Sequence, residues 1–256
     1  MNSGTKSLLI IGICVLVFTP VNAQEKPVFE AKQGYLLDIS YSIQNPSGDL
    51  EKRFGYNSAI GVGGRYKFES GWTLGFQYDW MFGNQVKEVS MFDSILGPTG
   101  EIIDQNGQYA VVRLNQRGHT LTLNGGRLFP VLKSNKNSGI LVDVGFGFMW
   151  HRIDIFASTV TVPQITGDYE KGYDRLCGGL ALKQFLGYQH LDPKKRINLQ
   201  AGFVLQQAFT QSMRSYNYDT REYDDTKRRD LLTGFRIGFS VPIYTKKRSE
   251  EEFFID

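Results

Sequence analysis

Residues 60–82, IGVGGRYKFESGWTLGFQYDWMF, alternate between large apolar residues and small or polar ones on both sides of a short turn at 69–71. From Trp72 to Phe82 every second residue is apolar and most are aromatic. The residues between them are Thr73, Gly75, Gln77, Asp79 and Met81. A period of two is the pattern of a β-strand whose two faces meet different surroundings. The stretch predicts a β-hairpin, and it leaves open whether the apolar face meets a protein core or lipid.

The same alternation recurs along the chain and predicts six further strands. They lie near residues 35–44, 117–128, 139–151, 174–190, 197–209 and 231–243, and the register of 117–128 is the least defined. The predicted connections alternate in length. Short ones fall at 69–71, 130–138 and 191–196, and longer polar ones at 45–55, 84–116, 152–173 and 211–229. Eight strands with short turns at one end and long loops at the other are typical of an outer-membrane barrel.

The expected fold class is therefore all-β, an eight-stranded antiparallel up-and-down transmembrane β-barrel over residues 34–244. Strands of about ten residues suffice to cross a bilayer at a barrel's tilt. Because only alternate residues meet lipid, a mean hydropathy of −0.28 does not conflict with a membrane location. A soluble barrel or β-sandwich is the alternative, and it would place the apolar face inside.

The second face of the predicted strands combines glycines with charged residues, which indicates the barrel interior. An eight-stranded barrel has room only for side chains or one small ligand. Charges of both signs can pair in such an interior, so the sequence predicts a closed, packed polar lumen. The candidate lumen residues are Arg65, Lys67, Asp79, Asp143, His151 and Arg236. The three tryptophans, Trp72, Trp80 and Trp150, are expected at strand ends, as interfacial girdles are.

The two ends of the chain have their own patterns. Residues 1–23 carry a basic start, a short apolar run and a small-residue cleavage site, which predict a secretory signal peptide. Residues 24–33 are then a periplasmic N-terminal segment and 245–256 a periplasmic C-terminal tail. With both termini periplasmic, the long loops are extracellular. Cys177 is the one cysteine left after cleavage, so no intramolecular disulfide is expected.

The most distinctive loop is SYNYDTREYDDTKRRD, residues 215–230. Tyrosine and arginine dominate protein interfaces, so this loop is a candidate partner-binding site. Its candidate residues are Tyr216, Tyr218, Arg221, Tyr223 and Arg228. Its aspartates, Asp219, Asp224 and Asp225, offer ligands for Ca²⁺ or for bridging lipid phosphates, although a solvated, self-paired loop explains the composition as well.

The C-terminal tail ends in Phe253, Phe254 and Ile255 after a charged run. Phe253 and Phe254 are candidates for docking a periplasmic partner by strand addition or by filling a groove. The alternative is a solvated end.

The sequence predicts no catalytic residues, no metal site and no cofactor. His151 lies on the inner face with Asp143, where it is either a proton-sensitive group or a satisfied interior histidine. His119 and His190 fall near strand ends. Eight-stranded lipid-modifying enzymes need a Ser/His pair at the outer rim, and the spacing of these histidines does not provide one. Cleavage of the signal peptide removes Lys6 and lowers the net charge from +3 (29 − 26) to +2 (28 − 26), which is too small to indicate a nucleic-acid partner.

Together, the predicted signal peptide, amphipathic strands and glycine-rich inner face resemble the small outer-membrane barrels of the OmpA/OmpW type. The aromatic, glycine-punctuated strands are similar to members from Bacteroidota. GYDRL, GYQHL, the Tyr/Asp/Arg-rich loop and the EEFF tail resemble accessory barrels of envelope machines. Examples are the PorG-type barrel of the type IX secretion system and an accessory barrel of the barrel-assembly complex. The charged tail departs from the common ending of such barrels on an aromatic residue.

These observations favour a structural or interaction subunit of an envelope complex for secretion or assembly. Its expected partners are outer-membrane lipid, lipopolysaccharide and other envelope proteins. A narrow channel for small or apolar solutes is the first alternative, and a lipid A-modifying enzyme is the second. Fully paired lumen charges would favour the interaction subunit over the channel.

Overall fold

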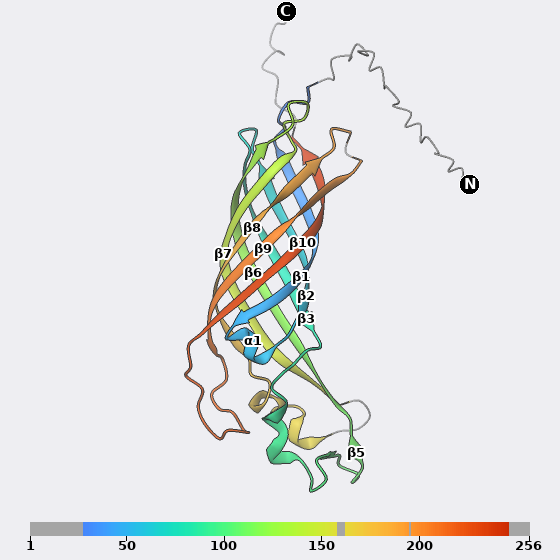
Figure 1. The fold of residues 1–256 in the computed structure, drawn as a ribbon, viewed down its shortest axis with the longest axis vertical. Helices are drawn as coiled ribbons and strands as arrows, with labels where there is room; N and C mark the ends of the chain where they lie inside the picture. The colour runs from blue at the N-terminus through green and yellow to red at the C-terminus, as the bar shows by residue number, and fades with distance from the viewer. Residues whose placement is uncertain (1–27, 158–161, 195, 246–256) are drawn as a thin grey trace, which may run out of the picture.

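The computed structural model describes residues 28–157, 162–194 and 196–245, and its eight long strands close into an antiparallel barrel (Figure 1). The order around the barrel is β1-β10-β9-β8-β7-β6-β3-β2. With the small β4-β5 hairpin set aside, neighbouring strands are consecutive along the chain, except for β1 and β10, which pair to close the barrel. The strands are β1 (Gly34–Gly48), β2 (Asn57–Lys67), β3 (Trp72–Gly83), β6 (Val112–Pro130), β7 (Gly139–Ala157), β8 (Cys177–Leu191), β9 (Asn198–Ser212) and β10 (Arg228–Tyr244). The predicted fold class is confirmed.

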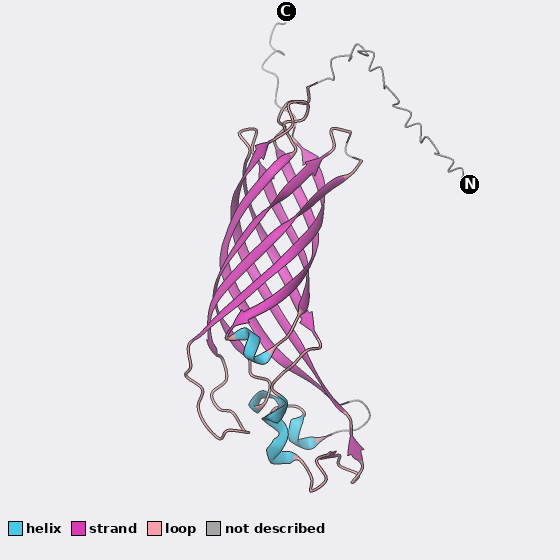
Figure 2. Ribbon diagram, viewed as in Figure 1, coloured by secondary structure: helices cyan, strands magenta, loops and turns pink. Residues whose placement is uncertain are grey.

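The connections differ sharply between the two ends of the barrel. At one end, here called the turn end, short connections follow β2, β6 and β8. At the other, the loop end, long segments carry all of the helices and the two-stranded hairpin (Figure 2). These elements are α1 (Leu50–Arg53), η1 (Val89–Ile95), β4 (Ile102–Ile103), β5 (Tyr109–Ala110), η2 (Pro163–Ile165) and η3 (Tyr169–Gly172). Both β1 and β10 have their outer chain ends at the turn end (Figure 1).

The outer wall of the barrel is apolar on every strand. In the opening hairpin Trp72, Leu74 and Phe76 are 53%, 63% and 56% exposed. The same outward exposure holds across the wall for Leu37, Ile39, Ile60, Val62, Leu121, Leu123, Val144, Phe146, Leu180, Leu186, Phe203, Phe235, Ile237 and Phe239. A water-soluble protein does not leave a continuous apolar belt of this extent in solvent. The hairpin therefore faces lipid, and the alternate residues face the interior.

Several strands run further than the sequence pattern predicts. β6 and β7 have 19 residues each and continue beyond the apolar belt at the loop end, where their outward residues become Arg117, Asn115, Arg152 and Asp154. As a result, the prediction that all three tryptophans lie at strand ends is wrong for two of them. Trp72 begins β3, but Trp80 and Trp150 lie inside β3 and β7. Each of them is paired in register with His119 of β6, which lies between the two strands. They mark the edge of the apolar belt rather than the end of a strand.

The interior has three layers along the barrel axis. Apolar Leu128, Leu141 and Phe185 pack together toward the turn end. Polar and charged side chains fill the middle. At the loop end a larger apolar core joins barrel residues such as Met149 to loop residues such as Phe92. The predicted packed polar lumen thus describes the middle of the barrel, whereas apolar and polar side chains share the interior toward both ends. At the loop end, the long loops supply part of the apolar core.

Two sets of predicted residues lie outside the described part of the chain. These are the signal peptide at 1–23 and the tail residues Phe253 and Phe254. Among the described residues, no helix is long and apolar enough to cross a membrane.

The lipid-facing assignment predicts the effect of placing a charge on the outer wall. Leu123 is 74% exposed at the middle of the belt, and Leu123→Arg should lower the free energy of unfolding by about 2–4 kcal/mol, measured by urea titration in lipid vesicles. Val111→Arg, at a 57% exposed site just before β6, should change it little. Equal stability of the two variants would contradict a lipid-facing wall.

Candidate functional site: the closed lumen and the loop-end cap

The middle of the lumen is a network of opposite charges contributed by different strands. Arg65 of β2 pairs with Asp38 of β1, with Nε 2.8 Å from Oδ2. Lys183 of β8 pairs with Asp79 of β3, and both side chains are almost completely buried. The first pair joins neighbouring strands, whereas the second joins β3 to β8, which β6 and β7 separate in the barrel.

Arg236 of β10 completes this layer. Its Nη1 donates to Oε1 of Gln77 at 2.7 Å, and its guanidinium lies 3.9 Å from the centre of the Phe185 ring. Gln77 in turn donates from Nε2 to Asp79 at 2.9 Å. Glycine provides the space for these side chains: a Cβ on Gly61 would lie 2.6 Å from the Asp79 carboxylate.

Asp143 belongs to the same layer. It accepts a hydrogen bond from Nδ2 of Asn124 at 2.7 Å and has no described contact with His151. The remaining cavity among these side chains is only about 20 Å³, room for roughly one water molecule. The middle layer is therefore closed to solutes.

Lys67 closes the turn end. Its ammonium donates to the carbonyl of Lys32 at 2.9 Å and to Oδ1 of Asn137 at 3.1 Å. The segment before β1 crosses this opening, because Phe29 forms backbone hydrogen bonds with Ser134 and Lys136. Lys67 thus holds an N-terminal strap across the barrel mouth instead of lining an open pore.

His151 lies in the loop-end part of the lumen, 1% exposed. Its Nε2 is 3.0 Å from Oδ2 of Asp230, which also accepts a hydrogen bond from Oγ1 of Thr210 at 2.5 Å. Phe54 packs edge-on against the imidazole, with ring centres 5.7 Å apart. The carboxylate partner of His151 is therefore Asp230 of β10. Asp143, which lies on the same face of β7 as His151, is bonded to Asn124 instead.

A plug fills the loop-end mouth, and the sequence did not predict it. The segment after β1, expected to be a polar loop, turns back as α1 and buries Leu50 and Phe54 completely. Both pack in the apolar core with Met81, Met149 and Ile153 of the barrel wall. Two apolar residues in a short polar stretch carry no periodic signal, so only the fold reveals their role.

Arg53 anchors the plug to three other segments. Its guanidinium lies 3.1 Å from Glu88, 3.0 Å from Sγ of Cys177 and 3.9 Å from Asp224. Glu88 also pairs with Arg175 at 3.4 Å. The four loop-end segments are thereby linked through one buried guanidinium.

Arg228 also pairs with Asp224, with Nη2 2.5 Å from Oδ2. Burial raises the pKa of Asp224, but the hydrogen bond and charge of Arg228 outweigh it and hold the pKa below its ordinary value of 3.8. A carboxylate with a lowered pKa stabilises the fold above its unfolded pKa, and the effect is lost as pH falls through the folded pKa. The contact is therefore fully formed at neutral pH.

The tyrosines of the last loop lie together in one cluster. The Tyr216 ring lies 5.3 Å from Tyr223 and 6.1 Å from Tyr218, centre to centre. Tyr218 also contacts Tyr173 at 5.8 Å, and its backbone N–H donates to the carbonyl of Gly172. A Cβ at Gly172 would lie 2.2 Å from the Tyr218 ring, so glycine is what lets the two loops meet.

This cluster borders a surface pocket of about 380 Å³ at the loop end. Tyr216 and Tyr218 form its aromatic side, and Arg214, Lys171 and Asp168 supply charge. Arg214 is held in place by Asp174, with Nε 2.9 Å from Oδ1. Aromatic and arginine side chains held rigidly around a hollow are the composition of an interaction site.

The two arginines predicted to bind a partner in this loop have different surroundings. Arg221 is exposed, with a φ of 55°, whereas Arg228 begins β10 and faces Asp224 and Cys177 rather than the tyrosines. Asp219 pairs with Arg175. Since different arginines hold Asp219 and Asp224, the three aspartates form no shared calcium site, and the described residues contain no group of three or more metal-binding side chains.

The structure does bring one serine to a histidine, at the turn end. Oγ of Ser138 is 3.4 Å from Nδ1 of His190. That oxygen also contacts Asn135 at 2.9 Å and the backbone N–H of Leu191 at 2.9 Å, and Ser138 is fully buried. These bonds hold the turn after β6 against the end of β8. At the loop-end edge of the belt, His119 is bonded to the hydroxyl of Tyr78 at 2.6 Å.

Comparisons with known proteins bear on the fold alone. No protein-family model matches the chain, and no curated protein does. Among solved structures, Ail of Yersinia pestis in complex with the heparin analogue sucrose octasulfate is 10% identical with a TM-score of 0.41, over 82% of this chain and 99% of its own. Neisserial surface protein A is 10% identical with a TM-score of 0.40, over 82% and 97%. OprG from Pseudomonas aeruginosa is 11% identical with a TM-score of 0.37, over 83% and 97%.

These scores are too low to support a functional inference. The class of the protein follows instead from the closed strand order and the continuous apolar belt. The chain is an outer-membrane β-barrel with a packed interior and a structured cap at the loop end.

The central ion pair predicts a large penalty for removing one charge. Asp79→Asn leaves the buried Lys183 uncompensated and should lower the free energy of unfolding by about 3–5 kcal/mol. The double variant Asp79→Leu/Lys183→Met should recover most of this loss. Urea titration in vesicles measures both. Asp168→Asn, at an exposed loop ion pair, is the control and should have no measurable effect. A mild Asp79→Asn effect would contradict a closed middle layer.

Proposed function

We propose that this protein is an outer-membrane interaction barrel that acts through its loop-end cap, as a subunit of an envelope complex for secretion or assembly. In this arrangement both termini are periplasmic and the long loops are extracellular. The observation that carries the proposal is the combination of a lumen closed at three levels with an aromatic pocket built on the outside.

The closed lumen supports this role over that of a channel. A solute entering from the loop end meets Leu50 and Phe54, then the paired charges of the middle layer, and then the strap held by Lys67. Opening such a path would require breaking buried ion pairs at a cost of several kcal/mol. The narrow-channel alternative has no comparable observation in its favour.

The cap supports a protein partner. Tyr218 is held by contacts with a second loop, and Tyr216 packs between it and Tyr223. A partner would therefore not have to order these rings on binding, which favours affinity. Tyr223, 73% exposed, and Tyr218, 40% exposed, present aromatic area to the outside. The resemblance of the sequence to accessory barrels of envelope machines points to the same kind of partner.

Of the two alternatives, a channel and a lipid-modifying enzyme, the enzyme has the weaker support. A lipid-modifying barrel needs a reactive serine beside a histidine at the rim, facing lipid. The Ser/His contact that the structure contains is buried at the turn end, and its serine oxygen is occupied by turn-forming hydrogen bonds. Outward-facing His119 has a tyrosine as its hydrogen-bond partner.

The proposal predicts that the tyrosine cluster is required for partner binding. Tyr216→Ala/Tyr223→Ala should remove partners that co-purify with the full-length tagged protein extracted in mild detergent. Tyr109→Ala, at a 66% exposed loop tyrosine outside the cluster, should retain them. Mass spectrometry of the purified complexes gives the comparison. The absence of any stoichiometric partner, or equal loss in both variants, would refute the proposal.

The periplasmic tail is tested in the same way. A chain ending at residue 245, without Phe253 and Phe254, should lose a periplasmic partner if the tail docks one, while retaining those bound through the loop. Retention of every partner would restrict binding to the loop end.

A further inference from the structure

The outer wall of β8, β9 and β10 carries polar residues inside the apolar belt. Gln184 lies at the middle of the outward row of β8, between Leu182 and Leu186. Gln207 and Thr233 hold outward positions on β9 and β10, each with apolar outward residues before and after it along the strand. The three strands are consecutive around the barrel, so these residues form one patch, here called the glutamine patch (Figure 1).

The strand register makes the glutamine patch continuous. Leu205 of β9 is paired with Gln184 on one side and with Thr233 on the other. Gln207 is the next outward residue of β9 toward the loop end, which makes it the diagonal neighbour of Gln184. Diagonal neighbours on a sheet are about 7–8 Å apart, within reach of long side chains.

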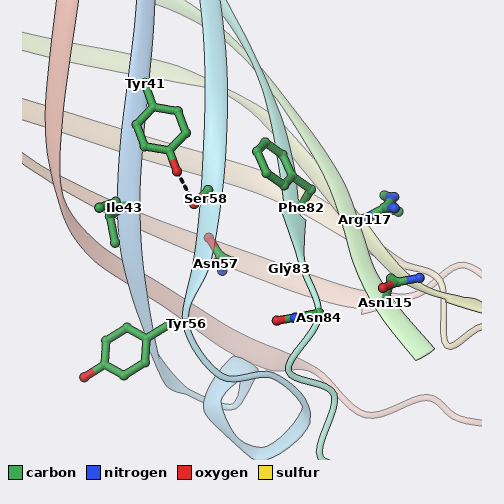
Figure 3. Close-up of a pocket in the computed structure, with 10 residues that line it drawn as sticks. All are labelled: Tyr41, Ile43, Tyr56, Asn57, Ser58, Phe82, Gly83, Asn84, Asn115 and Arg117. Atoms are coloured by element: carbon green, nitrogen blue, oxygen red, sulfur yellow. Dashed lines mark hydrogen bonds between the residues drawn. The ribbon is translucent and has the colours of Figure 1, made fainter. Parts of the chain in front are cut away.

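The amides of this patch have no partner in the barrel. No described residue forms a hydrogen bond with the side chain of Gln184 or Gln207. On the opposite side of the wall, by contrast, the outward hydroxyl of Ser58 is paired with that of Tyr41 at 2.7 Å (Figure 3). An amide in hydrocarbon without a hydrogen-bond partner is costly, and acyl chains offer none. The glutamine patch therefore requires a polar partner from outside this chain.

The patch lies along a groove of about 520 Å³ in the outer wall. Gln184, Thr233 and Val144 line this groove. Phe203 also lines it and projects from the wall, 70% exposed, with its ring centre 5.6 Å from that of Phe235. This part of the wall is thus an aromatic ridge beside a hollow that holds unpaired amides.

A second copy of the chain supplies the hydrogen bonds that the patch lacks. Two copies with the same orientation in one membrane are related by a two-fold axis along the membrane normal, so a residue on the axis meets its own equivalent at the same depth. A side-chain amide both donates and accepts, which makes it complementary to itself, whereas a carboxylate or a guanidinium is not. An axis at Gln184 therefore gives a reciprocal pair of hydrogen bonds.

The same symmetry matches the ridge to the hollow. β9 and β7 lie on opposite sides of β8, so an axis at Gln184 sets β9 of each copy against β7 of the other. Phe203 of one copy then faces the side of the groove that Val142 and Val144 form in the other. These valines are smaller than the outward aromatic residues that follow them on β7, which leaves space for the ring.

We propose that two copies of this protein associate side by side through β8 and β9, with the Gln184 amides paired on the two-fold axis and Gln207 inside the same contact. The groove is then occupied by the wall of the second copy. This contact lies within the membrane and leaves the tyrosine pocket free, so its failure would leave the proposed partner interaction untouched.

Cross-linking through engineered cysteines in outer membranes tests the geometry. Leu186→Cys places a thiol next to Gln184 along β8, and a short bis-maleimide should link two full-length chains. Val62→Cys is the matched control because it is similarly exposed, 47% against 55%, but lies on β2 at the opposite side of the barrel. It should stay monomeric, as should the unaltered chain, whose Cys177 is buried.

Each contrary result of the cross-linking is decisive. Equal cross-linking of both variants would show random encounters, and no product from Leu186→Cys would exclude contact through β8. A product that joins the chain to a different protein would assign the groove to another partner. Any of these three results would overturn the proposal.

The role of the amides is tested by the dissociation constant of the dimer in lipid vesicles, measured by energy transfer between two labelled populations of the full-length protein. Gln184→Leu/Gln207→Leu should raise this constant roughly tenfold, as expected for the loss of reciprocal side-chain hydrogen bonds in a bilayer. Ser58→Ala, which removes an outward polar group from β2, should leave it unchanged. Heat-dependent gel mobility confirms that each variant is folded. An unchanged constant in the glutamine variant, or an equal rise in Ser58→Ala, would overturn the proposal.

Discussion

The pairing of β1 with β10 is the constraint on which the rest of the structure depends. The two strands register from Gly34 opposite Tyr244 to Gly48 opposite Asp230. In lipid, an unpaired strand edge would leave backbone groups without hydrogen-bond partners, so only closure makes a sheet viable. Closure with eight strands then fixes a narrow interior. Because side chains alternate along a strand, every second residue points into that interior.

Charged side chains in this interior are neutralised by ion pairs between strands. Arg65 with Asp38 and Lys183 with Asp79 neutralise each other, and inward glycines such as Gly61 leave room for the longer side chains. Apolar clusters lie on both sides of this network along the barrel axis. Because the interior is occupied in this way, the proposed interaction would use the outer surfaces, above all the tyrosine pocket at the loop end.

Much of the fold could be predicted from the sequence, since alternation over ten residues specifies both a strand and its two faces. The lumen residues Arg65, Asp79 and Arg236 were identified by phase alone, and the structure places all three in one layer. Their partners could not be predicted, because cross-barrel neighbours depend on strand order and shear. The assignment of His151 to Asp230 shows this: the two residues are 79 positions apart and meet only once the barrel closes.

The loops were the least predictable part. α1, with Leu50 and Phe54, lacks a periodic pattern, and its burial depends on a mouth that the strands create. The same holds for the extension of β6 and β7 past the belt, where polar outward residues hide the alternation. The tyrosine loop was recognised from composition, yet the composition did not show that Arg228 would turn away from the tyrosines toward Cys177.

The measurement that tests the central claim most directly is the conductance of the full-length protein reconstituted in a planar lipid bilayer. A lumen sealed by paired charges between two apolar layers predicts current indistinguishable from the bare bilayer over the usual voltage range. Reproducible stepwise openings whose size scales with salt concentration would show a continuous aqueous path and would contradict the closed-barrel account.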